Sequence, residues 1–365
     1  MKNLLFGLLA VAVISITFQS CKEDIELSGD FTETAVVYGL LDQADSIHML
    51  KITRAFIGPG DAFQIAQIPD SNYFSSVTGT VTEYINGAVA RIFTLSDTLV
   101  DNKDPNGVFY APEQKLYYFE TPSGQPLIGT AEYKLDLVIN GGEFEVHGTT
   151  PLVDGMSNNN ITVQNQPYRF VGNTGDYIST SVSVNTGTAE QINVTLNVEF
   201  TEWIGATGTT KTFDWLLGEA TVDGSVNKNF VANGETFYNL MAENCTNNGA
   251  IDKRTFNSIT ATITGGSEEF VNYMQVNEPS STLAQSKPTF TNLTATNGHP
   301  VVGLFSSRNT ISIYKPFIDP GGNSNVRCIN KQTTERLCVG SITAPYFFCS
   351  DHPADIASSE PWVCN

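Results

Sequence analysis

The chain consists of short runs of β-branched and aromatic residues separated by turn residues, and few stretches keep the apolar repeat of a helix for three turns. Six such runs, several joined by short turns, lie in the first 150 residues. They predict a mainly β protein that begins with an immunoglobulin-like β-sandwich over residues 32–153. The predicted strands cover residues 34–41, 47–56, 80–85, 88–95, 132–139 and 143–149.

Two local signals support the strands of this first domain. Asn86-Gly87 separates two apolar runs, and this pair favours a type I′ hairpin turn because both central positions need φ > 0. Residues 132–139 alternate between apolar and polar side chains, with Tyr133, Leu135 and Ile139 on one face. That alternation is typical of a strand with one buried side.

A second β-rich domain is predicted over residues 154–316. An Asn-rich stretch at residues 158–160 marks the seam, after which the strands resume. Its strands run longer than those of the first domain. In one of them, over Asn193 to Glu199, polar and apolar residues alternate. The predicted strands cover residues 177–184, 191–202, 211–217 and 259–264.

One short helix is expected after the last of these strands. Ser267 can cap its N-terminus, and Glu268 and Glu269 favour the positive end of the helix dipole. Phe270, Tyr273 and Met274 would share one face, which we expect to make core contacts.

The N-terminus has the three parts of a secretory signal. Lys2 precedes a mostly apolar run at residues 4–18, shorter than the about 20 residues that a membrane-spanning helix needs, so we predict a signal peptide over residues 1–20. The following Cys21 completes a sequence, Phe-Gln-Ser-Cys, that resembles a lipobox. Acyl chains on Cys21 would anchor the protein in a lipid bilayer. The alternative is an ordinary signal peptide with an incidental cysteine.

Residues 21–31 are predicted to form a lipidated tether. Lys22, Glu23 and Asp24 follow the acceptor cysteine directly, and they resemble the short signal that sends lipoproteins to the cell surface in Bacteroidota. The alternative is a solvated charged tether, which short charge runs usually are.

The charge balance is strongly acidic. Without residues 1–20, which contribute only Lys2, the chain has 18 Lys and Arg against 38 Asp and Glu, a net charge of −20. Such a body repels phosphate backbones, so we expect no nucleic-acid partner.

The tail over residues 317–365 is rich in Gly, Pro and polar residues and holds four cysteines. A segment with so little apolar pattern is expected to need covalent cross-links, and outside the cytoplasm thiols oxidise. Zinc binding is the alternative, although no Cys-x-x-Cys spacing is present. Cys245 is left over, either buried or joined to the tail. The predicted pairs are Cys328 with Cys338 and Cys349 with Cys364.

Nothing in the sequence points to catalysis. The histidines lack metal-ligand spacings such as His-Glu-x-x-His, no Gly-x-Ser-x-Gly is present, and the Gly-Gly pairs lack the residues of a phosphate loop. We therefore expect no enzyme, no catalytic residue, no metal and no cofactor. The four histidines are His48, His147, His299 and His352.

Aromatic residues supply the candidates for partner binding. Trp203 and Trp215 are expected in the core of the second domain. The aromatic residues of the small tail are harder to bury and are predicted to contact a partner or a ligand. These candidates are Trp362, Tyr346, Phe347 and Phe348.

Residues 35–58, which begin Ala-Val-Val-Tyr-Gly-Leu-Leu-Asp, resemble the opening of an uncharacterised family of Bacteroidota surface lipoproteins. Residues 107–110 with 116–117, and residues 289–292 with 303–308, are similar to that family as well. Genes of the family commonly lie beside those of TonB-dependent outer-membrane receptors. The resemblance implies no catalytic residue, and the Cys-rich tail departs from the family pattern.

These observations lead to one hypothesis with two alternatives. The first is a lipid-anchored outer-membrane protein, facing the extracellular side, that serves as a non-catalytic accessory subunit of an outer-membrane β-barrel complex. That complex would be a TonB-dependent receptor or the machinery that assembles barrels or lipoproteins. The second is a stand-alone surface protein that binds a glycan or a peptide, and the third is a hydrolase.

Overall fold

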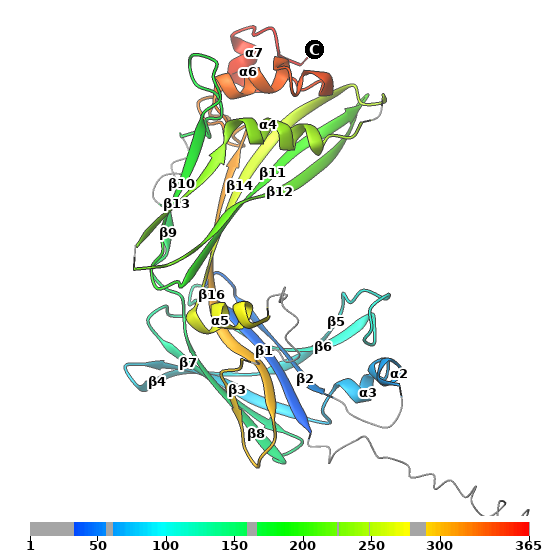
Figure 1. Ribbon diagram of the computed structural model, residues 1–365, viewed down its shortest axis with the longest axis vertical. Coiled ribbons are helices and arrows are strands. Elements are labelled where there is room, and N and C mark those ends of the chain that lie inside the picture. The colour runs from blue at the N-terminus through cyan, green and yellow to red at the C-terminus, as the bar shows by residue number, and fades with distance from the viewer. Residues whose placement is uncertain are drawn as a thin grey trace, which may run out of the picture.

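The computed structural model describes residues 33–55, 61–158, 166–224, 226–247, 249–277 and 290–364. The protein is mainly β, with 49% strand and 15% helix, which confirms the predicted fold class. Figure 1 shows two lobes joined at a waist, with the C-terminus at the far end of the upper lobe. Each lobe has its own hydrophobic core.

The lower lobe is a sandwich of two sheets whose inward side chains form one core. Its strands begin and end close to the predicted ones, and the Asn86-Gly87 turn has φ of 51° and 78° as a type I′ turn requires. The immunoglobulin-like strand order is not confirmed. Two short helices, α2 (Ala62–Ala66) and α3 (Pro69–Asn72), follow β2. One sheet contains β1 (Thr34–Asp42), β2 (Ile47–Ala55), β5 (Ser96–Asp101) and β6 (Glu113–Glu120), and the other contains β3 (Val77–Ile85), β4 (Ala88–Thr94), β7 (Glu132–Ile139), β8 (Phe144–Pro151) and β15 (Leu293–Ala295).

The upper lobe packs long strands against a small sheet and several helices (Figure 1). Its elements are β9 (Ser157–Asn158), β10 (Ser179–Asn185), β11 (Gln191–Ile204), β12 (Thr207–Thr221), β13 (Asn227–Asn233), α4 (Gly234–Glu243), β14 (Lys253–Gly266), α6 (Lys331–Val339), the 3-10 turn η1 (Ala344–Tyr346) and α7 (Pro353–Ala357).

A single strand, β16 (Val301–Pro316), runs through both lobes. Its first half pairs in parallel with β1, and its second half pairs antiparallel with β14. The two halves therefore join the sheets of both lobes into one sheet of eight strands, in the order β12-β11-β14-β16-β1-β2-β6-β5. The predicted boundary at residues 153/154 lies at the waist, but the second domain does not run unbroken to residue 316. The chain returns to the lower lobe at β15, which pairs with β8, and β16 then pairs with the edge of β1 that β2 leaves open.

Side chains from both lobes meet at the waist around Asp42, which is 1% exposed. Its carboxylate accepts hydrogen bonds from the Thr310 hydroxyl at 2.7 Å and from Arg308 Nε at 3.2 Å. Gln43 and Asn309 both donate to the carbonyl oxygen of Val153. These bonds connect the end of β1 to β16 and to the segment that enters the upper lobe.

The C-terminal tail is not a separate unit held only by cross-links, as the sequence suggested. Phe317, Ile329 and Leu337 are each at most 1% exposed and belong to the core of the upper lobe. The apolar side chains of the tail thus pack into the core formed by the long strands of the upper lobe. The composition of the tail could not indicate this packing.

The cysteines of the tail form one disulfide, not two. Cys349 and Cys364 are bonded with a Cα–Cα distance of 4.9 Å, which confirms that pair. Cys328 and Cys338 are reduced and buried, so that predicted pair is wrong. Cys338 lies within α6 (Lys331–Val339), whose rise of about 1.5 Å per residue carries it away from Cys328, which precedes the helix.

Removing the Cys349–Cys364 disulfide is expected to destabilise the tail. The bond closes a loop with a sequence separation of 15, for which loop entropy predicts a loss of about 3 kcal/mol. Denaturant unfolding of a double Ala variant would measure it, with Cys328→Ala as a control that removes a buried thiol but no bond. Titration of the denatured, unreduced and lipidated protein should find three thiols, on Cys245, Cys328 and Cys338; five would contradict the disulfide.

Candidate functional site

The eight-stranded sheet has one face that carries no core. Along β16 the odd-numbered side chains point to the interior: Phe305 lies in the lower core, and Ile311 and Ile313 pack against the upper one. Side chains alternate between the faces of a strand, so the even-numbered residues of β16 all lie on the opposite side. We call this side the open face; it is continuous over both lobes.

One helix, α5 (Glu268–Asn277), crosses the open face at the waist (Figure 1). The Ser267 hydroxyl lies 2.6 Å from that of Ser306, and the Tyr273 hydroxyl lies 3.0 Å from that of Tyr38. Burial, and secondarily the Tyr273 hydroxyl, raises the pKa of Tyr38 to about 12, so Tyr38 is neutral at physiological pH. The predicted helix is confirmed, although Met274 is 50% exposed instead of forming a core contact.

The lower half of the open face exposes apolar side chains. They come from three adjacent strands, β16, β1 and β2, and β6 adds the half-buried Tyr118 opposite Met49. Lys51 of β2 is exposed on the same face, opposite Tyr38. Exposed apolar groups gathered on one face mark interaction surfaces in soluble proteins. The exposed members are Tyr38 at 38%, Ile47 at 46%, Met49 at 44% and Val302 at 37%.

The upper half of the open face is polar instead. Asn197 of β11 donates to Asp214 of β12 at 2.8 Å, and neighbouring positions carry threonine and serine. Two large apolar side chains interrupt this pattern, Leu216 at 55% and Tyr314 at 59% exposure. The hydroxyl-bearing members are Thr195 of β11, Thr260, Thr262 and Thr264 of β14, and Thr310 and Ser312 of β16.

A pocket of about 530 Å³ lies where α5 meets the upper half of the open face. We call it the waist pocket. One wall comes from β11, β12 and β14 and is polar, and the other comes from α5 and is largely apolar. The lining residues are Gln191, Asn193, Glu219, Thr221, Thr264, Gly266, Phe270, Val271, Met274 and Gln275.

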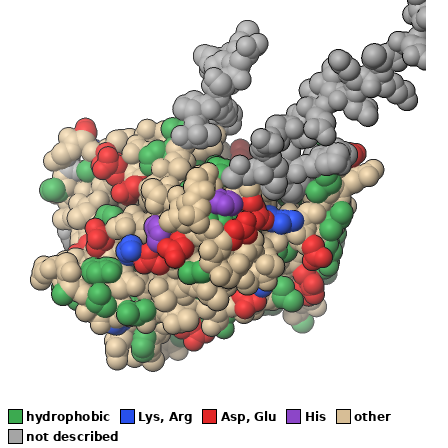
Figure 2. Space-filling model, turned by 90° about the horizontal axis from the view of Figure 1, so that it is seen from below, with side chains coloured by type: hydrophobic (Ala, Val, Ile, Leu, Met, Phe, Trp, Pro, Cys, Tyr) green, Lys and Arg blue, Asp and Glu red, His purple; other side chains and the backbone are tan. Residues whose placement is uncertain are grey.

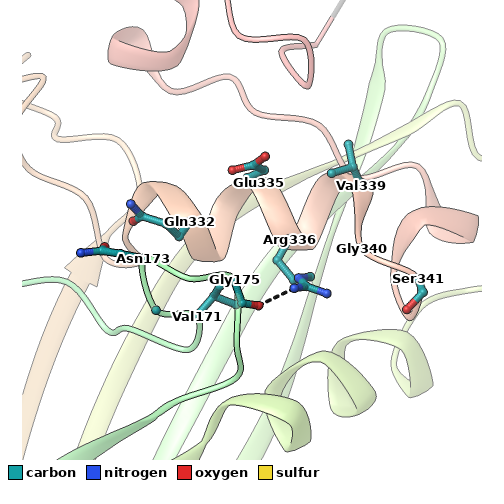
Figure 3. Close-up of a pocket in the computed structure, with 10 residues that line it drawn as sticks. Val171, Asn173, Gly175, Gln332, Glu335, Arg336, Val339, Gly340 and Ser341 are labelled. Atoms are coloured by element: carbon teal, nitrogen blue, oxygen red, sulfur yellow. Dashed lines mark hydrogen bonds between the residues drawn. The ribbon is translucent and has the colours of Figure 1, made fainter.

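A second hollow, of about 380 Å³, lies beside α6. Figure 3 shows Arg336 of α6 directed at the loop before β10, where its guanidinium donates to the carbonyl oxygen of Gly175. The same group lies 5.2 Å from the centre of the Tyr177 ring. Arg336 therefore holds the tail against this loop, and we assign it a structural role.

The aromatic residues predicted to bind a partner are mostly buried. Trp362 is 8% exposed and Phe348 is 4% exposed, both within the upper core, and Tyr346 packs against that core as well. Phe347 alone of the four is exposed, at 61% of its surface. The prediction is therefore wrong for Trp362 and Phe348, because it treated the tail as too small to have a core. Trp215 lies in the upper core as predicted, whereas Trp203 is half-buried.

Each free thiol and each imidazole has its own structural surroundings. Burial raises the pKa of Cys328 and of Cys338 to about 12, so both remain protonated near neutral pH. Within the ranges that the structure describes, no three His, Cys, Asp or Glu side chains are placed to hold a metal ion. His48 stacks on Phe119, His147 lies between Asp136 and Glu145, His299 stacks on Phe144, and His352 caps α7.

The predicted lipidation site, Cys21, and the predicted export signal, Lys22, Glu23 and Asp24, lie outside the described residues. The described chain begins at Glu33, at the lower end of the lower lobe (Figure 1). Figure 2 shows that end, where acidic side chains predominate over basic ones and histidine side chains are also exposed. In the described part of the chain, no helix is long and apolar enough to cross a membrane.

Neither a family model nor a curated protein matches this chain in sequence. The resemblance to Bacteroidota surface lipoproteins therefore stays a prediction. The structure adds one observation to it: residues 35–42 and 301–308, which carry two of the similar stretches, are paired strands in the sheet.

Proposed function

We propose that this chain is a lipid-anchored outer-membrane protein that serves as a non-catalytic accessory subunit of a β-barrel complex. The barrel would be a TonB-dependent receptor or part of the machinery that assembles barrels or lipoproteins. The observation that carries the proposal is the apolar lower half of the open face, formed by Tyr38, Ile47, Met49 and Val302. A sheet face with exposed aromatic and aliphatic side chains suits a large, flat protein partner.

The position of the tether favours a partner in the same membrane. Eleven residues separate Cys21 from Glu33 and span at most about 40 Å when extended. A lipidated Cys21 would hold the lower lobe near the bilayer and leave the upper lobe pointing away from it. The acidic lower end in Figure 2 disfavours direct contact with anionic headgroups, and the apolar half of the open face offers a barrel a surface for contact.

Co-purification from native membranes in mild detergent tests the proposal. We expect a stoichiometric barrel protein with the wild-type chain, and recovery of the wild-type chain as a lone monomer would contradict the proposal. Cys21→Ala should release the protein from the membrane, since the acyl anchor would be lost.

Two surface variants locate the interface. Met49→Glu places a charge on the lower half of the open face, and Val231→Glu places one on β13, in a different sheet, where the side chain is 54% exposed. Met49→Glu should lose the barrel, because a charge buried against an apolar partner costs several kcal/mol, and Val231→Glu should retain it. Retention by both variants would refute the assignment of the open face.

A further inference from the structure

The waist pocket has a preformed polar wall. The Glu219 carboxylate accepts one hydrogen bond from each of two amides, Asn193 Nδ2 at 3.0 Å and Gln191 Nε2 at 3.3 Å. The Asn193 carbonyl oxygen in turn accepts from the Thr195 hydroxyl at 3.3 Å. These bonds fix the orientation of the side chains before any ligand arrives, which lowers the entropy lost on binding.

The facing wall comes from α5, and a glycine of the sheet lets its apolar side chains approach closely. Gly266 lies at the end of β14, and a Cβ added there would come within 2.7 Å of Phe270 Cδ1 and 3.4 Å of Val271 Cγ2. The absence of a side chain at this position lets the Phe270 ring rest on the sheet. Phe270, Val271 and the half-exposed Met274 therefore form an apolar surface opposite the amides.

We propose that the waist pocket binds a neutral saccharide. Sugar hydroxyls both donate and accept hydrogen bonds, which matches a wall of amides, hydroxyls and one carboxylate. The C–H face of a sugar ring packs on an aromatic ring and on aliphatic groups, which the α5 wall supplies. The volume of about 530 Å³ lies within the range of ligand pockets. Glu219 and the net charge of −20 disfavour anionic sugars.

The position of the pocket favours a saccharide over an extended peptide. A peptide that adds to a sheet needs the unpaired backbone of an edge strand. β11 and β14 are interior strands whose backbones are bonded on both sides, and β12, although it is the edge strand, lines the pocket with Glu219 and Thr221 on the open face of the sheet. A cationic peptide attracted by Glu219 remains the competing outcome of the test.

Calorimetric titration of the purified full-length protein in detergent tests the proposal. The probes are neutral gluco-, manno- and xylo-oligosaccharides, oligogalacturonate as the anionic sugar, and oligolysine as the cationic peptide. We expect at least one neutral oligosaccharide to bind with a Kd below about 1 mM. Binding of oligolysine alone, of oligogalacturonate alone, or of none of the probes would overturn the proposal.

Variants of one strand provide the matched control. Asn193→Ala should weaken saccharide binding about tenfold through lost hydrogen bonds, and Phe270→Ala should weaken it at least as much. Asn197→Ala, four residues along the same strand, removes a similar amide bond to Asp214 outside the pocket and should leave the Kd unchanged. Equal affinities in all three variants would place the site elsewhere. The titration uses no barrel partner, so its result is independent of the proposed complex.

Discussion

Replacing Arg254 with methionine is expected to lower the free energy of unfolding by about 3–5 kcal/mol, because the change leaves the carboxylate of Glu202 buried without its main partner. The two side chains are 2% and 3% exposed. Arg254 Nε and Nη2 both donate to Glu202 Oε1, at 2.9 and 2.7 Å. The same guanidinium donates to the carbonyl oxygens of Thr246 and Tyr346, so it also fastens the tail to β14.

The effect should depend on pH. Burial by itself would raise the pKa of Glu202, but hydrogen bonds from Thr246 and from Arg254 outweigh it and hold the pKa below its usual range. The ion pair therefore stabilises the fold above the unfolded-state pKa of about 4.3, and this contribution is lost as the pH falls through the lower, folded-state value. Because Glu202 protonates more readily without Arg254, the deficit of Arg254→Met should shrink in acid.

Denaturant unfolding at several pH values measures both effects. The control is the double variant Arg254→Met with Glu202→Leu, which replaces the pair by apolar groups and should recover most of the lost stability. A single variant that loses less than about 1 kcal/mol near neutral pH, or a double variant as unstable as the single one, would show that the pair contributes little.

Gly303→Ala is expected to cost about 2–6 kcal/mol and to weaken the pairing of β16 with β1. Gly303 has φ of 113°, a conformation that costs other residues about 1–3 kcal/mol. A Cβ there would also lie 1.9 Å from the Val37 carbonyl oxygen, and overpacking typically costs a further 1–3 kcal/mol. The backbone of β1 would have to move to accept the methyl group.

Gly142→Ala separates the two contributions to this cost. Gly142 has a similar φ of 106° but nothing within 4 Å of an added Cβ, so it should lose only the part due to backbone strain. Thermal or denaturant unfolding of both variants gives the comparison. Equal losses would mean that the contact with Val37 adds nothing.

Local pattern was sufficient for most of the individual strands. The alternation at residues 132–139 predicted β7 with its observed ends, and Asn86-Gly87 placed the β3–β4 turn. Both signals act between residues close in sequence, where φ preference and side-chain alternation decide the outcome. Strands β5, β6, β9, β13, β15 and β16 were not predicted. The runs of β5 and β6 are short and interrupted by charged residues.

The candidate site was not predictable in the same way. The alternation of Asn193 with apolar residues showed a polar strand face, and the sequence placed a helix after Ser267, but neither indicated that the two would form opposite walls of one pocket. The prediction that Trp362 and Phe348 bind a partner was wrong for a related reason. Both side chains are buried in a core formed by strands that lie over a hundred residues earlier in the sequence.

Residue pattern and composition were sufficient for the β class, the local turns and the acidic charge, and they gave the predictions of export and lipidation through Cys21. The complete fold was needed to show that β16 belongs to both lobes, that Cys328 and Cys338 are not bonded, and that one face of the sheet is open with α5 across it (Figure 1). These features depend on contacts between distant residues, such as Gly303 with Val37 and Tyr273 with Tyr38. No local preference encodes such contacts; they follow from which apolar faces can be buried together.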